Sequence, residues 1–278
     1  MTVQPLVSVE ELQHALSAGP PPVLLDVRWS LAGPDGAGEY ALGHLPEAVY
    51  VDLDTQLARP HGPGEGRHPL PEPAALQQVL RSAGISRDTP VVLYDAGPST
   101  SAARGWWVLR WAGLGDVRVL DGGLAAWRSA GGSVTTDVPR PVAGDVVVRA
   151  GSLPVLSAQE AAALPADGVL LDARAPERFR GEVEPMDPVA GHVPGAVNAP
   201  TTGALGPDGR FLPAAALAER FAGLGAVPGV RVGVYCGSGV TAAHTLLALT
   251  VAGVEGALYP GSWSEWVTDP DRPIATGA

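Results

Sequence analysis

The sequence predicts an α/β protein made of two tandem domains, each with a mainly parallel sheet flanked by helices. Short β-branched runs alternate with longer helical patterns, for example at residues 75–83 and 214–222. Several segments of the first half also recur, in the same order, in the second half. The length of 278 residues suits two domains of about 140 residues each. We therefore expect one α/β domain that occurs twice.

Four pairs of matching segments define the repeat. Segments 23–28, 43–49, 91–95 and 119–123 correspond to segments 169–174, 191–197, 232–236 and 257–261, respectively. Between the two copies lies a stretch that contains Pro and Gly and has no strong hydrophobic period. The predicted organisation is a first domain over 1–132, a linker over 133–154 and a second domain over 155–278.

The predicted strands are almost continuously apolar, as is typical of parallel sheets covered by helices on both faces. They span residues 23–26, 91–94, 117–120, 170–172 and 230–235. In open sheets of this kind, ligands bind beyond the carboxyl ends of the strands. Cys236, the only cysteine of the chain, directly follows the last of these strands. The pattern therefore places a thiol at the edge where a binding site is expected.

The surroundings of Cys236 favour a reactive thiolate. Gly237 and Gly239 allow the backbone to curl so that successive N–H groups point inward. A helix predicted from Thr241 adds its unpaired amides and the positive end of its dipole. We expect these groups to lower the pKa of the thiol from about 8.5. A lone free cysteine is more often a small buried hydrophobe, but the glycine loop reverses that preference.

Composition excludes several classes of function. The chain has 18 Lys and Arg against 29 Asp and Glu, a net charge of −11, whereas phosphate binding needs clustered cations. No apolar run approaches the roughly 18 residues of a membrane span, and the N-terminus does not resemble a secretory leader. One cysteine cannot form an internal disulfide or a thiolate-rich zinc site. We expect a cytoplasmic protein that needs no metal or cofactor and binds neither nucleic acid nor membrane.

The repeated Leu-Asp-x-Arg and Gly-His-x-Pro segments and the loop 236–242 resemble the tandem rhodanese family of two-domain sulfurtransferases. The resemblance covers nearly the whole chain. It implies a catalytically silent first domain, in agreement with Asp95 at the counterpart of Cys236. It also implies that Cys236 takes sulfur from a small-molecule donor as a persulfide and passes it to an acceptor, either a thiol such as thioredoxin or a small thiol, or cyanide. The predicted persulfide cradle consists of Gly237, Ser238, Gly239, Val240 and Thr241.

The loop also resembles one donor type within this family. Members that use thiosulfate usually carry basic residues directly after the cysteine, whereas this chain has the neutral Gly237 and Ser238, as in members that use 3-mercaptopyruvate. A hydroxyl beside the sulfur can relay the proton that a leaving pyruvate enolate needs. The resemblance maps a Ser-His-Asp relay onto Ser238, His44 and Asp35. A packing or loop-fixing role is the alternative for His44, because His192 repeats it. A preference for thiosulfate is the alternative for the donor.

Two arginines are candidates for binding the carboxylate of the donor, Arg178 and Arg180. The substrate-binding arginine of the family corresponds to Arg178. The second such arginine of mercaptopyruvate enzymes would fall near Met186, where this chain has no basic residue. A solvated surface charge is the alternative for Arg180. Arg174 is expected to be structural, since Arg28 repeats it in the silent half.

Other motifs have less specific interpretations. Trp263 and Trp266 are expected to pack in the core, with a place in the wall of the site as the alternative for Trp263. Residues 66–71 are expected to form an interdomain loop, with no role assigned to His68. A cysteine phosphatase is disfavoured, because its Cys-x5-Arg loop requires an arginine where this chain has Ala242. A non-catalytic sulfur carrier or regulatory module remains the other alternative.

Overall fold

The computed structural model describes residues 4–278, which divide into two compact units. Unit 1 holds the residues up to Arg59, Leu70–Leu153 and Pro207–Arg210. Unit 2 holds Pro60–Pro69, Pro154–Gly206 and Phe211–Ala278. The loop 60–69 thus comes from the first half of the sequence but belongs to the second unit.

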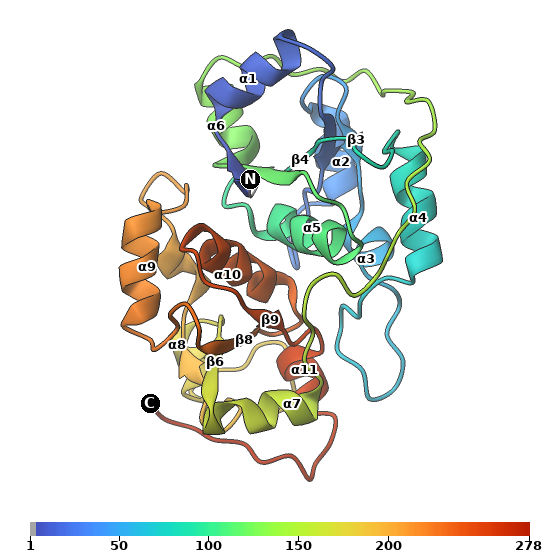
Figure 1. Cartoon of the computed structure of the whole chain (residues 1–278). Helices are drawn as coiled ribbons and strands as arrows, with labels where there is room; N and C mark the ends of the chain where they lie inside the picture. Colours follow the sequence, from blue (N-terminus) through green and yellow to red (C-terminus); the bar gives the residue numbers. More distant parts are fainter. Residues whose placement is uncertain (1–3) are drawn as a thin grey trace. The chain divides into compact units, whose positions relative to one another are not determined.

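Unit 1 is a five-stranded sheet with helices around it (Figure 1). The strand order is β1-β5-β4-β2-β3, and every pairing is parallel. Its elements are β1 (Leu6–Val7), α1 (Val9–Ser17), β2 (Val23–Asp26), α2 (Gly36–Leu42), β3 (Val49–Tyr50), α3 (Leu53–Gln56), α4 (Pro73–Ser82), β4 (Val91–Tyr94), α5 (Thr100–Trp111), β5 (Val117–Leu120) and α6 (Gly123–Ser129).

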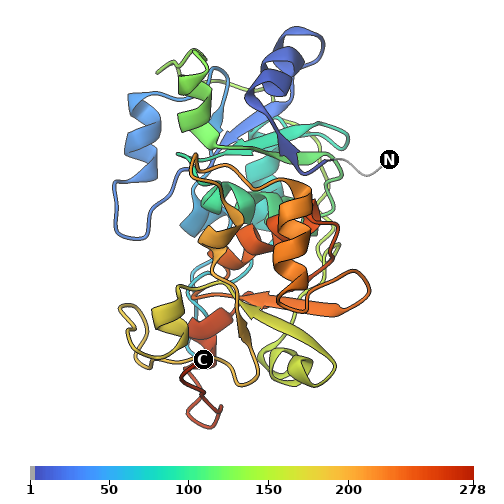
Figure 2. The same ribbon diagram turned by 90° about the vertical axis from the view of Figure 1, so that its left-hand side faces the viewer.

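Unit 2 repeats this arrangement with a four-stranded parallel sheet in the order β7-β6-β8-β9. The order matches β3-β2-β4-β5 of unit 1, and a parallel bridge from Val155 to Leu258 takes the place of β1. Its elements are α7 (Ala158–Ala163), η1 (Leu164–Ala166), β6 (Gly168–Asp172), α8 (Pro176–Phe179), β7 (Val197–Asn198), η2 (Thr201–Ala204), α9 (Ala214–Ala222), β8 (Arg231–Tyr235), α10 (Val240–Val251), β9 (Ala257–Leu258) and α11 (Ser262–Trp266). The contact between α9 and α10 can be followed in Figures 1 and 2. The predicted duplicated parallel α/β fold is confirmed.

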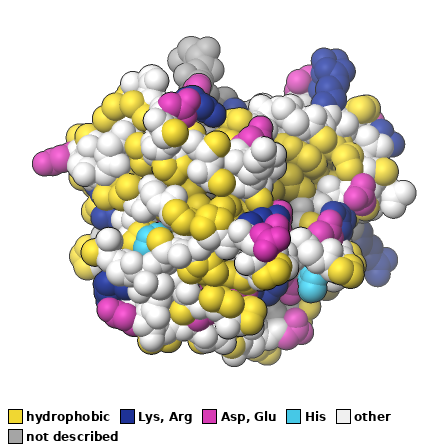
Figure 3. Space-filling view, turned by 90° about the horizontal axis from the view of Figure 1, so that it is seen from below, with side chains coloured by type: hydrophobic (Ala, Val, Ile, Leu, Met, Phe, Trp, Pro, Cys, Tyr) yellow, Lys and Arg dark blue, Asp and Glu magenta, His cyan; other side chains and the backbone are white. Residues whose placement is uncertain are grey.

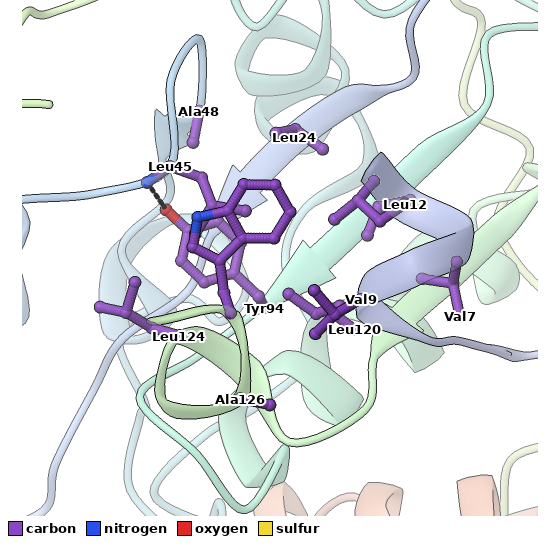
Figure 4. Packing of buried hydrophobic residues seen from close by; sticks show 12 residues of the cluster. Val7, Val9, Leu12, Leu24, Leu45, Ala48, Tyr94, Leu120, Leu124 and Ala126 are labelled. Carbon is purple, nitrogen blue, oxygen red and sulfur yellow. Dashed lines mark hydrogen bonds between the residues drawn. The ribbon is translucent and has the colours of Figure 1, made fainter. Parts of the chain in front are cut away.

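The two cores share a buried tyrosine whose hydroxyl binds a backbone N–H group. In unit 1, residues of α1, β2, β4 and α6 form one apolar cluster, in which the Tyr94 hydroxyl accepts a hydrogen bond of 3.1 Å from Leu45 N–H (Figure 4). In unit 2, the Tyr235 hydroxyl accepts the corresponding bond from Val193 N–H, also at 3.1 Å. A buried hydroxyl needs such a partner, since an unpaired polar group is costly in a core. The tyrosine that ends each central strand thereby fixes the loop above it.

The predicted linker lies along unit 1, where residues 136–153 form no helix or strand. Arg81 Nε donates to the carbonyl of Val146 at 2.8 Å, and Gly144 N–H donates to the carbonyl of Arg81 at the same distance. Backbone groups outside regular structure are thus paired with α4.

The surface in Figure 3 shows Arg side chains scattered among Asp and Glu, without a continuous basic patch on that face. Within residues 4–278, none of the helices is long and apolar enough to cross a membrane.

Candidate active site

Cys236 lies in the short loop between the end of β8 and the start of α10, with its side chain almost fully buried at 2% exposure. Gly239 has a φ of +83°, a left-handed conformation that favours glycine. That turn brings the N–H of Gly239 to 3.1 Å from the Cys236 sulfur, to which it donates. An amide donor and the N-terminal end of a helix both favour negative charge on the sulfur. The loop predicted as a persulfide cradle therefore has the geometry of an anion site.

The loop is supported from below by the start of α11. Ser262 Oγ accepts a hydrogen bond of 3.1 Å from the backbone N–H of Cys236. The N–H groups of Trp263 and Ser264 donate to the carbonyls of Cys236 and Gly237, both at 2.9 Å. With its carbonyls engaged in this way, the loop holds its conformation before any substrate binds.

Two guanidinium groups lie against the loop at Gly237. A Cβ atom added to Gly237 would lie 3.1 Å from Arg67 Nη2 and 3.6 Å from both Nη1 and Nη2 of Arg178. Arg178 is one of the two arginines expected at the site. Arg67, in the loop 60–69, was not among them.

Two buried carboxylates hold these arginines. Glu184 accepts from Arg178 Nη2 at 2.6 Å and from Nε at 3.1 Å, while Asp187 accepts from Arg67 and lies 3.5 Å from Arg178 Nη2. Burial works to raise the pKa of Glu184, but the hydrogen bonds from Arg178 and from the N–H groups of Met186 and Asp187 outweigh it and lower the pKa. The guanidinium groups are thus fixed by buried carboxylate partners.

Ser238 pairs with a different histidine from the one expected. Its Oγ lies 2.7 Å from His68 Nδ1, and both side chains are buried. His68 is held in place because the preceding residue, Arg67, donates its backbone N–H to Ser264 Oγ at 3.1 Å. A hydroxyl paired with an imidazole next to a thiol can move protons at that thiol.

His44 and Asp35 have partners within unit 1. The ring nitrogens of His44 lie 2.9 Å from the Tyr40 carbonyl and 3.1 Å from the Asp137 carbonyl, and the ring stacks on Tyr40. Asp35 caps α2 by accepting from two backbone N–H groups at 3.2 Å. In unit 2, His192 repeats the stacking and carbonyl contact through Phe179. These contacts support the alternative for His44, a packing and loop-fixing role.

Comparison with known protein families matches the Rhodanese-like domain twice, at residues 8–130 and 157–269. The chain belongs to the rhodanese family. Its closely similar relatives include the protein named "Putative thiosulfate sulfurtransferase SseB" of Mycobacterium tuberculosis, which is 51% identical over 280 residues, covering 99% of this chain and 98% of the relative. The "Probable 3-mercaptopyruvate sulfurtransferase" of Pseudomonas aeruginosa is 49% identical over 284 residues, covering 100% of both chains.

A solved rhodanese structure has the same two-domain architecture. The crystal structure of SseA from Escherichia coli, which is named as a 3-mercaptopyruvate sulfotransferase with the rhodanese fold, superposes on this chain with a TM-score of 0.83 at 30% sequence identity. The match covers 95% of this chain and 100% of SseA. Family and relatives together confirm the predicted class of enzyme, a sulfurtransferase.

In this rhodanese, the loop of unit 1 that corresponds to the cysteine loop has its backbone N–H groups bound by the side chain of Asp95. The Asp95 carboxylate accepts from the N–H groups of Gly97, Ser99 and Ser101 at 3.0 Å and of Ala102 at 3.2 Å. Burial raises the pKa of Asp95, and these donors act against that rise. The amides that would hold a ligand in unit 1 are therefore already occupied.

One further site candidate, Arg180, and three residues expected to be structural remain to be placed in this rhodanese. Arg180 is partly exposed and pairs with Glu182 at 2.7 Å, away from the contacts that hold Arg178. Arg174 is buried, binds Asp172 at 2.6 Å and lies 4.6 Å from the centre of the Trp263 ring. Arg28 forms the same pair with Asp26 at 2.7 Å in unit 1. Trp263 and Trp266 are fully buried, as expected for core residues.

Sequence reasoning missed Arg67 and left His68 without a role, although a signal was available. The segment that carries them has no counterpart among the repeated segments of the second half. A residue that one copy has and the other lacks is free of the structural tasks that the two copies share. Lack of repetition therefore pointed to loop 60–69, just as repetition pointed away from His44.

Proposed function

We propose that this chain transfers sulfur from 3-mercaptopyruvate through a persulfide on Cys236 to a thiol acceptor. The observation that carries the choice of donor is the neutral loop beside Cys236, with Ser238 paired to His68 at 2.7 Å. A pyruvate enolate needs a proton as it leaves, whereas sulfite leaves thiosulfate without one. A proton-relaying pair should therefore speed the reaction with 3-mercaptopyruvate and make no difference to the reaction with thiosulfate.

In the first half-reaction, the Cys236 thiolate attacks the sulfur of the donor. An S–S bond forms, the C–S bond breaks, and its electron pair goes to carbon as the pyruvate enolate. The Ser238 hydroxyl, paired to His68, hands a proton to the enolate carbon and regains one through the imidazole. Pyruvate leaves, and the loop amides hold the persulfide.

In the second half-reaction, an acceptor nucleophile attacks the outer sulfur. The S–S bond breaks, and the Cys236 thiolate re-forms. A thiol such as thioredoxin or a small thiol, or cyanide, supplies this nucleophile. A reducing compartment, which we propose to be the cytoplasm, keeps the single cysteine free for this cycle.

The test compares kcat/KM for 3-mercaptopyruvate and thiosulfate on wild type, Ser238→Ala and His68→Asn, with Cys236→Ser as the blank. We expect Ser238→Ala and His68→Asn to lower turnover of 3-mercaptopyruvate by about 100-fold, a usual size for lost proton transfer, and to affect thiosulfate little. Equal losses for both donors would contradict the proton-relay role.

The variant His44→Asn separates the two histidines. If His44 only fixes its loop, this variant should keep the ratio of the two kcat/KM values at that of wild type, even where stability falls. A selective loss of 3-mercaptopyruvate turnover in His44→Asn would restore the relay of Ser238, His44 and Asp35.

A thiosulfate-preferring enzyme is the second candidate, because the two guanidinium groups at Gly237 can also donate hydrogen bonds to the oxygens of thiosulfate. A non-catalytic sulfur carrier would accept one sulfur on Cys236 and show no multiple turnover with either donor.

A further inference from the structure

We propose that Arg67 and Arg178 together bind the carboxylate of the sulfur donor at Gly237. In this proposal, Arg67 supplies the second carboxylate-binding arginine, which the sequence lacks near Met186. The inference rests on the proposed function and adds to it a residue that determines the choice of donor, contributed by the loop 60–69.

The two arginines present unused donors to the same place. Both guanidinium groups lie within 3.6 Å of the position that a Gly237 Cβ would take. Arg178 donates to Glu184 through Nε and Nη2, so its Nη1 is the group left facing the loop. Arg67 binds Asp187 through Nη1, while its Nη2 lies 3.1 Å from the same Cβ position. Each guanidinium group therefore has an N–H donor beside Gly237 that is not used in its bond to Glu184 or Asp187.

Arg67 is fixed on both sides and is not a mobile surface arginine. Its side chain binds Asp187, and its backbone N–H donates to Ser264 Oγ. The preceding residue, Gly66, lies so close to Gly261 that an added Cβ would come within 2.3 Å of the Gly261 carbonyl oxygen. Only glycine allows this approach, which sets the position of Arg67 before a donor arrives.

The charges at the site favour one carboxylate over a dianion. Glu184 and Asp187 are 3% and 4% exposed, so their two negative charges offset those of Arg67 and Arg178. The arginines therefore offer directed N–H donors with little excess positive charge. A planar carboxylate matches such donors through paired hydrogen bonds, whereas a sulfonate dianion would bring uncompensated charge.

The experiment uses the single cysteine as its own probe. Iodoacetate and iodoacetamide alkylate the same thiol, but only iodoacetate carries a carboxylate. We expect Arg67→Gln to lower the rate ratio of iodoacetate to iodoacetamide by about tenfold, since a charge-assisted hydrogen bond is worth at least that factor. The iodoacetamide rate should stay near wild type, which shows that the loop remains folded. Arg231→Gln is the matched control, because Arg231 is exposed at the opposite end of β8.

The double variant Arg67→Gln/Asp187→Asn removes the carboxylate that the single change leaves unpaired. We expect it to keep the low ratio. A ratio that returns to the wild-type value would show that the uncovered charge of Asp187 caused the effect, and would overturn the proposal. An unchanged ratio in Arg67→Gln would overturn it directly.

Steady-state kinetics of the same variants test the link to the donor. Arg67→Gln should raise KM for 3-mercaptopyruvate about tenfold and leave kcat near wild type, because it removes binding and leaves the proton relay intact. If wild type turns over neither donor, the proposed function fails, while the alkylation ratio still decides whether Arg67 binds a carboxylate.

Discussion

Replacing Asp95 by alanine should destabilise unit 1 while leaving sulfur transfer intact. The carboxylate of Asp95 accepts four backbone N–H bonds and a fifth, of 3.2 Å, from the Ser101 hydroxyl. Ser101 and Ala102 lie in the first turn of α5, and Ser99, at its N-cap, makes no side-chain cap of its own. Asp95 thus caps this helix from outside it.

The size of the effect follows from the donors that lose their acceptor. Four of them are buried: the N–H groups of Ser99, Ser101 and Ala102 and the Ser101 hydroxyl. Each buried donor without a partner costs about 1–3 kcal/mol, and water entering the vacated space recovers part of that cost. We expect Asp95→Ala to lower the free energy of unfolding by about 3–5 kcal/mol. Asp95→Asn keeps one acceptor oxygen and should lose less.

Urea unfolding followed by tryptophan fluorescence measures the loss, and hydrogen exchange of residues 97–102 locates it. Exchange is needed because two units can unfold in separate transitions, so one fluorescence curve does not identify the unit. A free energy of unfolding within about 0.5 kcal/mol of wild type would refute the reasoning. So would loss of turnover by folded Asp95→Ala, since the reacting thiol lies in unit 2.

Three further predictions concern unit 2. Gly239→Ala places a side chain at a φ of +83°. The substitution should lower the free energy of unfolding by about 1–2 kcal/mol and lower kcat with both donors, because it shifts the N–H that faces the sulfur. An unchanged kcat would rule out that N–H as a hydrogen-bond donor to the persulfide. The pKa of Glu184 is lowered, against its burial, by Arg178, so ionised Glu184 adds stability above its unfolded pKa of about 4.3 and loses it as the pH falls through its lower folded pKa. The stability advantage of wild type over Glu184→Gln in urea should therefore shrink from about pH 5 to about pH 3, and a constant gap would contradict this. Arg174→Lys should lower the melting temperature clearly, because lysine cannot keep the forked contact with Asp172; an unchanged melting temperature would mean that the pair is not structural.

Five strands could be predicted because buried parallel strands are almost continuously apolar, whereas β1, β3, β7 and β9 have two residues each and are too short to give such a run. Strands β2, β4 and β5 have the bounds that the apolar runs predicted, and β6 and β8 differ only at their first residues. The long helix α5 offered no such signal. It is buried from Ser101 to Leu109, so it lacks the one-sided apolar stripe from which a helix is read.

The site divides in the same way between local and distant contributions. Cys236 and its loop are contiguous in the sequence, so the strand, the glycines and the start of the helix could all be predicted from one segment. The partner of Ser238, by contrast, lies 170 residues earlier in the chain. Periodicity and spacing predict elements, but not which distant segment of the chain lies beside Cys236. The motif alone therefore points to His44, whereas the structure places His68 next to Ser238.

The duplication itself separates structural from functional residues. The pairs Arg28–Asp26 and Arg174–Asp172 occupy equivalent places, and so do the histidines stacked on Tyr40 and Phe179. Repetition in both units favours a structural role for these residues, because only unit 2 has the thiol.

At the loops, by contrast, the two units differ in ways that bear on chemistry. In unit 1 the residue before the stacking Tyr40 is the acidic Glu39. In unit 2 the residue before the stacking Phe179 is the basic Arg178. Asp95 fills the amides of its loop with its own carboxylate, whereas in the cysteine loop the N–H of Gly239 faces the Cys236 sulfur. If Cys236 carries the persulfide, as we propose, the same type of loop holds a fixed carboxylate in unit 1 and a transferable sulfur in unit 2.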